Sequence, residues 1–192
     1  LCESTSCGVH QVSACTAAPT TSPAPTATVA PTASPLVAVD GYGDNGIRTA
    51  LSLWSWDRAA AIRKYGHIST WQTGGVKDMS ELFGELNRWY TTFNDDIGGW
   101  DTSGVTTMKE MFYKNPSFNQ PIGKWKTSAV KDMDDMFNKA SSFNQDLSGW
   151  DVSAVTTMED IFLEAGDFNQ DLGWCLDNSV VLRDAFKKAK CE

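Results

Sequence analysis

The sequence predicts an α/β repeat solenoid of about four to five coils, each made of a short strand and a short helix. Three observations predict it. A leading Phe returns every 25 residues, the residue types behind each Phe return in register, and segments of different composition flank the repeats. A period of 25 is typical of solenoids, whose units bury their apolar faces only by stacking on neighbours. The leading residues are Phe93, Phe118, Phe143 and Phe168.

Two further columns recur in register with these Phe residues. Each Trp of one column stands between apolar neighbours, so we expect the Trp column to be buried in the stack. An Asn follows each Phe and predicts a ladder of side-chain amides that satisfies backbone groups at a corner. A ligand-binding polar row is the alternative for the Asn column. The columns are Trp71, Trp100, Trp125, Trp150 and Trp174, and Asn94, Asn119, Asn144 and Asn169.

A second part of each repeat carries a helix signal. Thr107, Asp132 and Thr157 each precede a carboxylate by three residues, which is the spacing of a capping box. Behind them, Met, then Met or Ile, then Phe occupy positions i, i+3 and i+4, which share one helical face. The sequence therefore predicts a short helical turn here and an extended half around each Trp.

The segment before the repeats predicts a helical cap. Asp44-Asn45-Gly46 precedes an amphipathic pattern that indicates one helix, and Asp57 through Tyr65 indicate a second. A terminal cap is needed because the end of the core would otherwise face water. The first coil, from Trp71 to Trp100, is longer than the others and predicts a four-residue insertion around residues 84–92.

The repeat F-N-Q-D-L-x-x-W-D-V-S-x-V-T-x-M-x-x-M-F, as in residues 143–162, resembles a known family. It is similar to the BspA-like surface-protein repeat, related to leucine-rich repeats, of mycoplasma lipoproteins and algal surface proteins. The resemblance covers roughly residues 40 to 192. It implies a leucine-rich-repeat-like solenoid in a secreted or surface protein, and it carries over no catalytic residue.

The cysteines favour an oxidising, extracellular setting. Cys2, Cys7 and Cys15 cluster near the start, and Cys175 and Cys191 lie near the end. Zinc is the weaker alternative, because the spacings do not match paired CxxC motifs. We expect Cys175 to pair with Cys191 and to hold a Lys-rich final helix on the last coil, giving a disulfide C-terminal cap.

The odd number of cysteines predicts a tandem arrangement. Leu1-Cys2-Glu3 echoes Lys190-Cys191-Glu192, so each period of an array would own four cysteines. Related algal sequences resemble this chain in continuing their C-terminal cap as Cys-Glu-Ser-Thr-Ser-Cys-Gly-Val, which is residues 2–9 here. The alternative is a single-copy secreted domain with a free thiol.

A linker rich in Pro, Ala and Thr separates the first cysteines from the helical cap. Its prolines favour an extended polyproline II spacer, and its composition resembles glycosylated mucin-like or hydroxyproline stalks. Plain disorder is the alternative. The prolines are Pro19, Pro23, Pro25, Pro31 and Pro35. The expected organisation is a Cys-rich segment (1–15), a linker (16–38), a helical cap (39–66), the solenoid (67–174) and a C-terminal cap (175–192).

Charge and motif content exclude several classes of function. A net charge of −8 and a pI near 4.7 argue against nucleic acid and anionic membranes as partners. The sequence has no transmembrane run, and its two His residues stand outside any catalytic motif, so we expect neither an enzyme nor a cofactor. Calcium is a weak alternative, because Pro121 interrupts its candidate ligands Asp95, Asp96, Asp146 and Asp171.

The sequence favours an extracellular structural building block of a filament, stalk or surface coat. Such a unit would associate with copies of itself through tandem or head-to-tail solenoids. The alternative is a recognition or adhesion module that binds a glycan or another surface protein on the solenoid face. Exposed aromatic residues outside the register would favour that alternative, and the candidates are Trp56, Trp89, Tyr90 and Tyr113.

Overall fold

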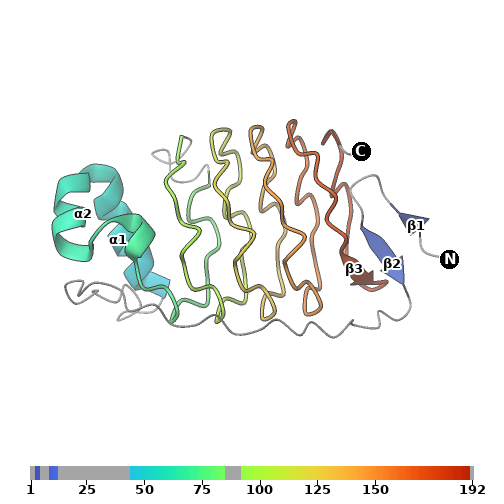
Figure 1. Ribbon diagram of the computed structural model, residues 1–192, viewed down its shortest axis with the longest axis horizontal. Coiled ribbons are helices and arrows are strands. Elements are labelled where there is room, and N and C mark those ends of the chain that lie inside the picture. The colour runs from blue at the N-terminus through green and yellow to red at the C-terminus, as the bar shows by residue number, and fades with distance from the viewer. Residues whose placement is uncertain (1–2, 5–8, 13–43, 85–91, 191–192) are drawn as a thin grey trace, which may run out of the picture.

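The computed structural model describes residues 3–4, 9–12, 44–84 and 92–190. Two helices, α1 (Asp44–Trp56) and α2 (Arg58–Tyr65), cover one end of the molecule, and η2 (Ile68–Thr70), a 3₁₀ turn, leads from them into a row of coils. Strands β1 (Glu3–Ser4), β2 (His10–Val12) and β3 (Cys175–Asp177) lie at the opposite end (Figure 1).

The described residues from 67 onward form a stack of coils, called the coil stack below. Parallel β-bridges join each coil to the next, from Asp78 to Thr107, Asp132, Thr157 and Val181 in turn. Backbone bonds follow the same direction: the N–H of Met108 donates to the oxygen of Asp132 at 2.9 Å, and the equivalent bonds recur one coil further on. The backbone of each coil is thus paired with the next coil, in addition to the tight turns within the coil itself.

The expected short helix in each repeat is wrong for the described coils. Residues 107–114 and their equivalents form turns in which Glu110, Asp135 and Asp160 have φ values of 54 to 57°. Thr107 and Asp132 do not cap a helix, because each accepts the N–H two residues on, from Lys109 and Asp134. A local side-chain turn and bonds to the next coil replace the helical bonds that a capping box would begin.

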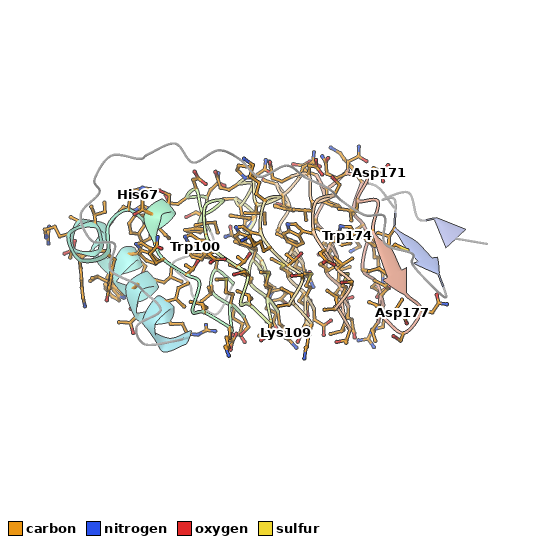
Figure 2. The ribbon with its side chains drawn as sticks, turned by 60° about the horizontal axis from the view of Figure 1, so that its bottom comes forward. His67, Trp100, Lys109, Asp171, Trp174 and Asp177 are labelled. Carbon is orange, nitrogen blue, oxygen red and sulfur yellow. The ribbon has the colours of Figure 1, made fainter. Side chains whose placement is uncertain are left out.

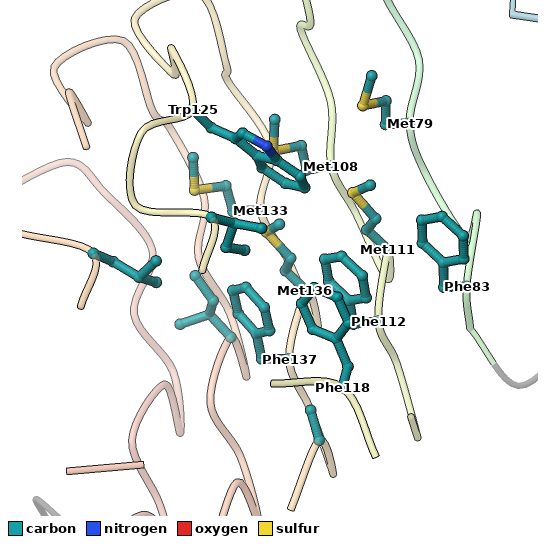
Figure 3. Close-up of a cluster of buried hydrophobic side chains, with 14 of the residues drawn as sticks. Met79, Phe83, Met108, Met111, Phe112, Phe118, Trp125, Met133, Met136 and Phe137 are labelled. Atoms are coloured by element: carbon teal, nitrogen blue, oxygen red, sulfur yellow. The ribbon is translucent and has the colours of Figure 1, made fainter. Parts of the chain in front are cut away.

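The aromatic and methionine residues of the helix signal are nevertheless all buried, because each turn points them into the stack (Figure 3). Phe83, Phe112, Phe137 and Phe162 form one column with ring centroids 5.3 to 5.5 Å apart. The leading Phe of the next repeat packs against each of the last three, as Phe118 does on Phe112 at 3.8 Å. These rings form a continuous aromatic core along the stack axis.

The Trp residues form a second buried column, and each is 2 to 4% exposed. Their rings stack 6.3 Å apart between Trp71 and Trp100, Trp125 and Trp150, and Trp150 and Trp174. Every indole N–H is satisfied by a backbone carbonyl of an earlier segment of the chain, as when Trp125 donates to Ile97 at 3.1 Å. The column therefore combines apolar burial with a repeated hydrogen bond.

Helices α1 and α2 close the first coil. Trp54 of α1 packs edge-on against Trp71, with centroids 5.8 Å apart, and its indole N–H donates to Asp95 at 3.0 Å. Arg58 of α2 meets the same carboxylate. Asp57 caps α2 by accepting the N–H of Ala60 at 2.8 Å. The second helix therefore begins at Arg58, one residue later than predicted.

The last coil contributes β3 to a small sheet of order β1-β2-β3. β2 pairs antiparallel with β1 and parallel with β3, where His10 lies opposite Cys175 and Val12 opposite Asp177. The expected Lys-rich helix near residue 187 is also wrong, because residues 183–190 repeat the turns of the earlier coils, with Asp184 and Lys188 at positive φ.

Most of the insertion that the sequence predicts in the first coil, at residues 84–92, lies outside the described residues.

We predict that Trp125→Ala lowers the free energy of unfolding by about 3 to 5 kcal/mol, because it leaves a cavity in the column and removes one of the two hydrogen bonds that the carbonyl of Ile97 accepts. Urea denaturation followed by tryptophan fluorescence or circular dichroism measures this. Trp56→Ala is the matched control: Trp56 is 70% exposed, and its loss should cost less than about 1 kcal/mol. Equal costs for the two variants would contradict the buried structural role of the column.

Candidate interaction surfaces

The Asn column forms a ladder of amides along one corner of the coil stack. The side-chain oxygen of Asn94 accepts the backbone N–H of Asn119 at 2.9 Å, and the same bond joins Asn119 to Asn144 and Asn144 to Asn169. The side-chain amide of the following Gln donates to the same oxygen at 2.8 to 3.0 Å, as Gln120 does to Asn94. The polar groups of this corner are therefore directed along the stack rather than toward a ligand.

A buried threonine column was missed from the sequence. Thr73, Thr102 and Thr127 are buried, and each hydroxyl donates to a backbone oxygen of the next coil at 2.9 to 3.0 Å. In the following coil Val152 takes the equivalent place, and it too is buried. The signal was present, since Thr102-Ser103 and Thr127-Ser128 recur at the 25-residue period two residues after each Trp.

The carboxylates that suggested calcium serve local turns or a cap contact. Asp96, Asp146 and Asp171 each accept the backbone N–H two residues on, at 2.8 to 3.2 Å. The side chain of Ser148, followed by its backbone N–H, lowers the pKa of Asp146 below its usual range, since both hydrogen bonds favour the charged form. Asp95 is bound to Trp54 and Arg58. Across the described ranges no group of three or more His, Cys, Asp or Glu side chains is placed to hold a metal ion.

A shallow groove runs along the turns that contain Asp96 and Asp146, and its lining is rich in glycine. A side chain on Gly98 or Gly123 would collide with the backbone oxygen of Pro121 or Asp146 in the next coil. Close coil packing therefore explains these glycines. Figure 2 shows Asp171 and Lys109 at opposite edges of the stack, with Trp100 and Trp174 between them.

A column of acidic residues occupies the left-handed turn of successive coils. Burial, followed by the charges of Glu81 and Asp135, raises the pKa of Glu110. Burial, followed by Asp135 and Asp184, raises the pKa of Asp160 in the same way. One carboxylate oxygen of Asp160 is also buried without a hydrogen-bond partner among the described residues. This column is consequently a source of charge repulsion at neutral pH.

The C-terminal edge of the coil stack is the surface where separate parts of the chain meet. Cys175 begins β3 and is disulfide-bonded, beside the paired strand β2. Its predicted partner Cys191, like Cys2, Cys7 and Cys15, lies outside the described residues, so the predicted pairing stays a prediction. The linker prolines lie outside them as well: Pro19, Pro23, Pro25, Pro31 and Pro35.

The two predicted aromatic candidates for recognition that the structure describes, Trp56 and Tyr113, do not line up on one face. Trp56 is exposed at the end of α1, and Tyr113 is half-buried in a coil turn with the ammonium of Lys114 5.0 Å from its ring centre. Trp89 and Tyr90 lie outside the described residues. The described pair belongs to different elements and forms no row along the stack.

Comparison with known proteins gives one match. A family model described as "Mycoplasma protein of unknown function, DUF285" matches residues 85–191, which is more than half of the chain. No curated protein and no solved structure matches the sequence or the fold. None of the helices in the described part of the chain has the length and apolar character needed to cross a membrane.

We predict that Asn119→Ala destabilises the chain by about 1 to 3 kcal/mol, since it leaves the N–H of Asn144 and the amide of Gln145 without their acceptor. Asn169→Ala is the matched control. Asn169 ends the ladder, and its side-chain oxygen accepts no ladder bond from a described residue, so its loss should cost a few tenths of that amount. Thermal melting of both variants gives the comparison; equal losses would contradict a directional ladder.

We predict that Asp160→Asn stabilises the protein at pH 7 by about 0.5 to 1 kcal/mol, or about 1 to 4 °C in Tm. Because the pKa of Asp160 is raised in the folded state, ionisation above that pKa removes stability, and the amide avoids this loss. The gain should disappear near pH 3, where Asp160 is protonated. Asn also tolerates the left-handed backbone better than most residues.

Glu164→Gln supplies the opposite control for that experiment. Its hydrogen bond from Lys188 lowers the pKa of Glu164, so this carboxylate contributes stability above its unfolded pKa and loses it as the pH falls. The variant should therefore melt below the parent at pH 7 and with it near pH 3. A destabilised Asp160→Asn at pH 7 would refute repulsion in the acidic column.

Proposed function

The chain belongs to the family described as "Mycoplasma protein of unknown function, DUF285", and from this membership we propose that its repeats are of the BspA-like kind and build a leucine-rich-repeat-like solenoid. We propose further that this solenoid is an extracellular structural unit of a filament, stalk or surface coat, joined to copies of itself in tandem or head to tail. The proposal gives the chain no catalytic role.

The observation that carries the proposal is that the repeated polar groups bond along the stack axis. The indole column, the Asn ladder, the Thr column and the backbone bridges all join one coil to the next. Such a unit resists extension and bending through many bonds in parallel, and each coil contacts only its neighbours. This arrangement suits a rigid element that carries force.

Two features support an extracellular setting and a role in an array. Cys175 is disulfide-bonded, and stable disulfides are typical of oxidising compartments. The composition of residues 16–38 favours a semi-rigid spacer between solenoid units, and its Pro-rich, Thr-rich character favours glycosylation. Rigid units separated by spacers make a filament or stalk.

The recognition alternative is supported by one exposed aromatic residue. Trp56 lies 70% exposed at the end of α1, near Tyr65 and Lys64, and it offers a small apolar contact for a glycan or a protein. The ladders along the coil stack do not need such a partner, which is why the structural role is the preferred proposal.

Negative-stain microscopy of the natural material tests the proposed function. We expect filaments or beaded stalks in which solenoid units repeat at a regular spacing. Monodisperse single units at high protein concentration, with no larger form on the source cells by immunolabelling against the coil stack, would overturn the structural role. Tight binding of a purified glycan that Trp56→Ala abolishes would then favour the recognition alternative.

A further inference from the structure

Strand β2 breaks the order in which the coils are stacked. The last three bridges of the parallel ladder run from Thr107 to Val181, and each joins a residue to one that lies 24 or 25 residues later in the chain. The open side of the last coil is instead occupied by β2, which comes from the start of the chain. β1, β2 and the last coil all lie at the same end of the molecule (Figure 1).

β2 resembles a further coil in its strand direction and in the burial of the residue before it. It runs parallel to β3, as all the bridges of the stack do. Val9, just before β2, is 1% exposed and belongs to the same core as the Trp column. The register of His10 with Cys175 places Val9 level with Trp174, and Gly8-Val9 matches Gly173-Trp174 in having Gly before the buried residue.

An independent sequence observation gives the same register. A shift of 189 residues carries Cys2-Glu3 onto Cys191-Glu192, and it carries His10 to position 199, which is 24 residues beyond Cys175. The preceding coil has that same spacing, from Trp150 to Trp174 and from Thr157 to Val181. The register of β2 against β3 comes from the backbone pairing, whereas the shift of 189 residues comes from the repeated Cys-Glu in the sequence. The two observations are independent, and both place His10 one 24-residue step beyond Cys175.

We infer that the C-terminal edge of the coil stack is a docking surface for residues 3–12 of an adjoining copy of this chain. In an array, this segment is the closing coil of the preceding unit and continues directly from its residue 192. In the single chain, β2 of the same segment pairs with β3 at the chain's own edge. The inference rests on the proposed function and names the joint between units.

Chain length allows both arrangements. Residues 13–43 separate β2 from α1 and reach about 100 Å when fully extended. Parallel neighbours are about 4.8 Å apart, so the five rungs from Asp78 to Val181 span only about 19 Å. Closing the edge with a segment that follows residue 192 directly removes the cost of closing that long loop, which favours the adjoining copy where copies are in tandem.

A rearranged chain tests the register. Residues 4–15 are moved to follow Glu192, and residues 1–3, which duplicate the junction, are left out. We expect this chain to melt at or above the Tm of the parent, and Val9→Asp to lower Tm equally in both chains. A large drop in Tm after rearrangement, or a rearranged chain that Val9→Asp leaves unchanged, would overturn the inference.

A shortened chain tests docking between copies. Deletion of residues 16–42 leaves four residues between Val12 and Asp44, a reach of about 18 Å, which is shorter than the ladder plus the added strand. We expect dimers or longer chains by light scattering, and monomers when Gln11→Pro removes an N–H from β2. A shortened chain that remains a folded monomer would show that β2 does not dock on another copy.

The two proposals fail separately. If the natural material forms no filament but the rearranged and shortened chains behave as expected, the docking surface stands and the structural role is wrong. If filaments form while the rearranged chain loses stability, the units are joined elsewhere and this inference is wrong.

Discussion

The structure depends on hydrogen bonds between a residue and its own counterpart one coil away. A residue type that returns in register can serve as the acceptor for one neighbour and the donor for the other, as Asn119 does between Asn94 and Asn144. Such a bond needs residues of the same type at equivalent places in successive coils. The 25-residue period from Phe93 to Phe168 keeps the Asn column in this register, while the backbone bridges also span a longer step, from Asp78 to Thr107.

The same requirement explains the unusual backbone of the turns. Glu110 and Lys114 have φ near 54°, a conformation that costs a non-glycine residue roughly 1 to 2 kcal/mol. Both donate their N–H to the next coil at 2.8 to 2.9 Å, to Asp134 and Asn138. The left-handed residues at 135, 139, 160 and 164 make the equivalent bonds. The hydrogen bonds between coils thus offset the local backbone strain. They stabilise these turns in place of the short helix that the local sequence favours.

The competition between bonds that join neighbouring coils and local helix preference determines which features the sequence could predict. The Trp and Asn columns were found from period and register alone, because burial and ladder bonding require identical residues at identical spacing. The helical turns around Met108 were predicted wrongly, since a capping box and an i, i+4 pattern describe only local preference. The Thr column at Thr102 has a weaker sequence signal because Val152 interrupts it, although both side chains are buried at the same place in the stack. The pairing of β2 with β3 had no local signal at all.

The two ends of the coil stack are covered in different ways, by helices α1 and α2 at the first coil and by strand β2 at the last coil. At the first coil, Arg48 of α1 donates to the backbone oxygen of Ser80 at 2.9 Å, and the helices that cover this end precede it directly in the chain. At the last coil, the covering strand is connected through the whole length of residues 13–43. A cover that follows chain order is fixed within its own unit, whereas a tethered strand can be supplied by another. If copies dock as proposed, growth of an array is directional, because α1 and α2 cover one end of each unit and the proposed docking surface at β3 lies at the other.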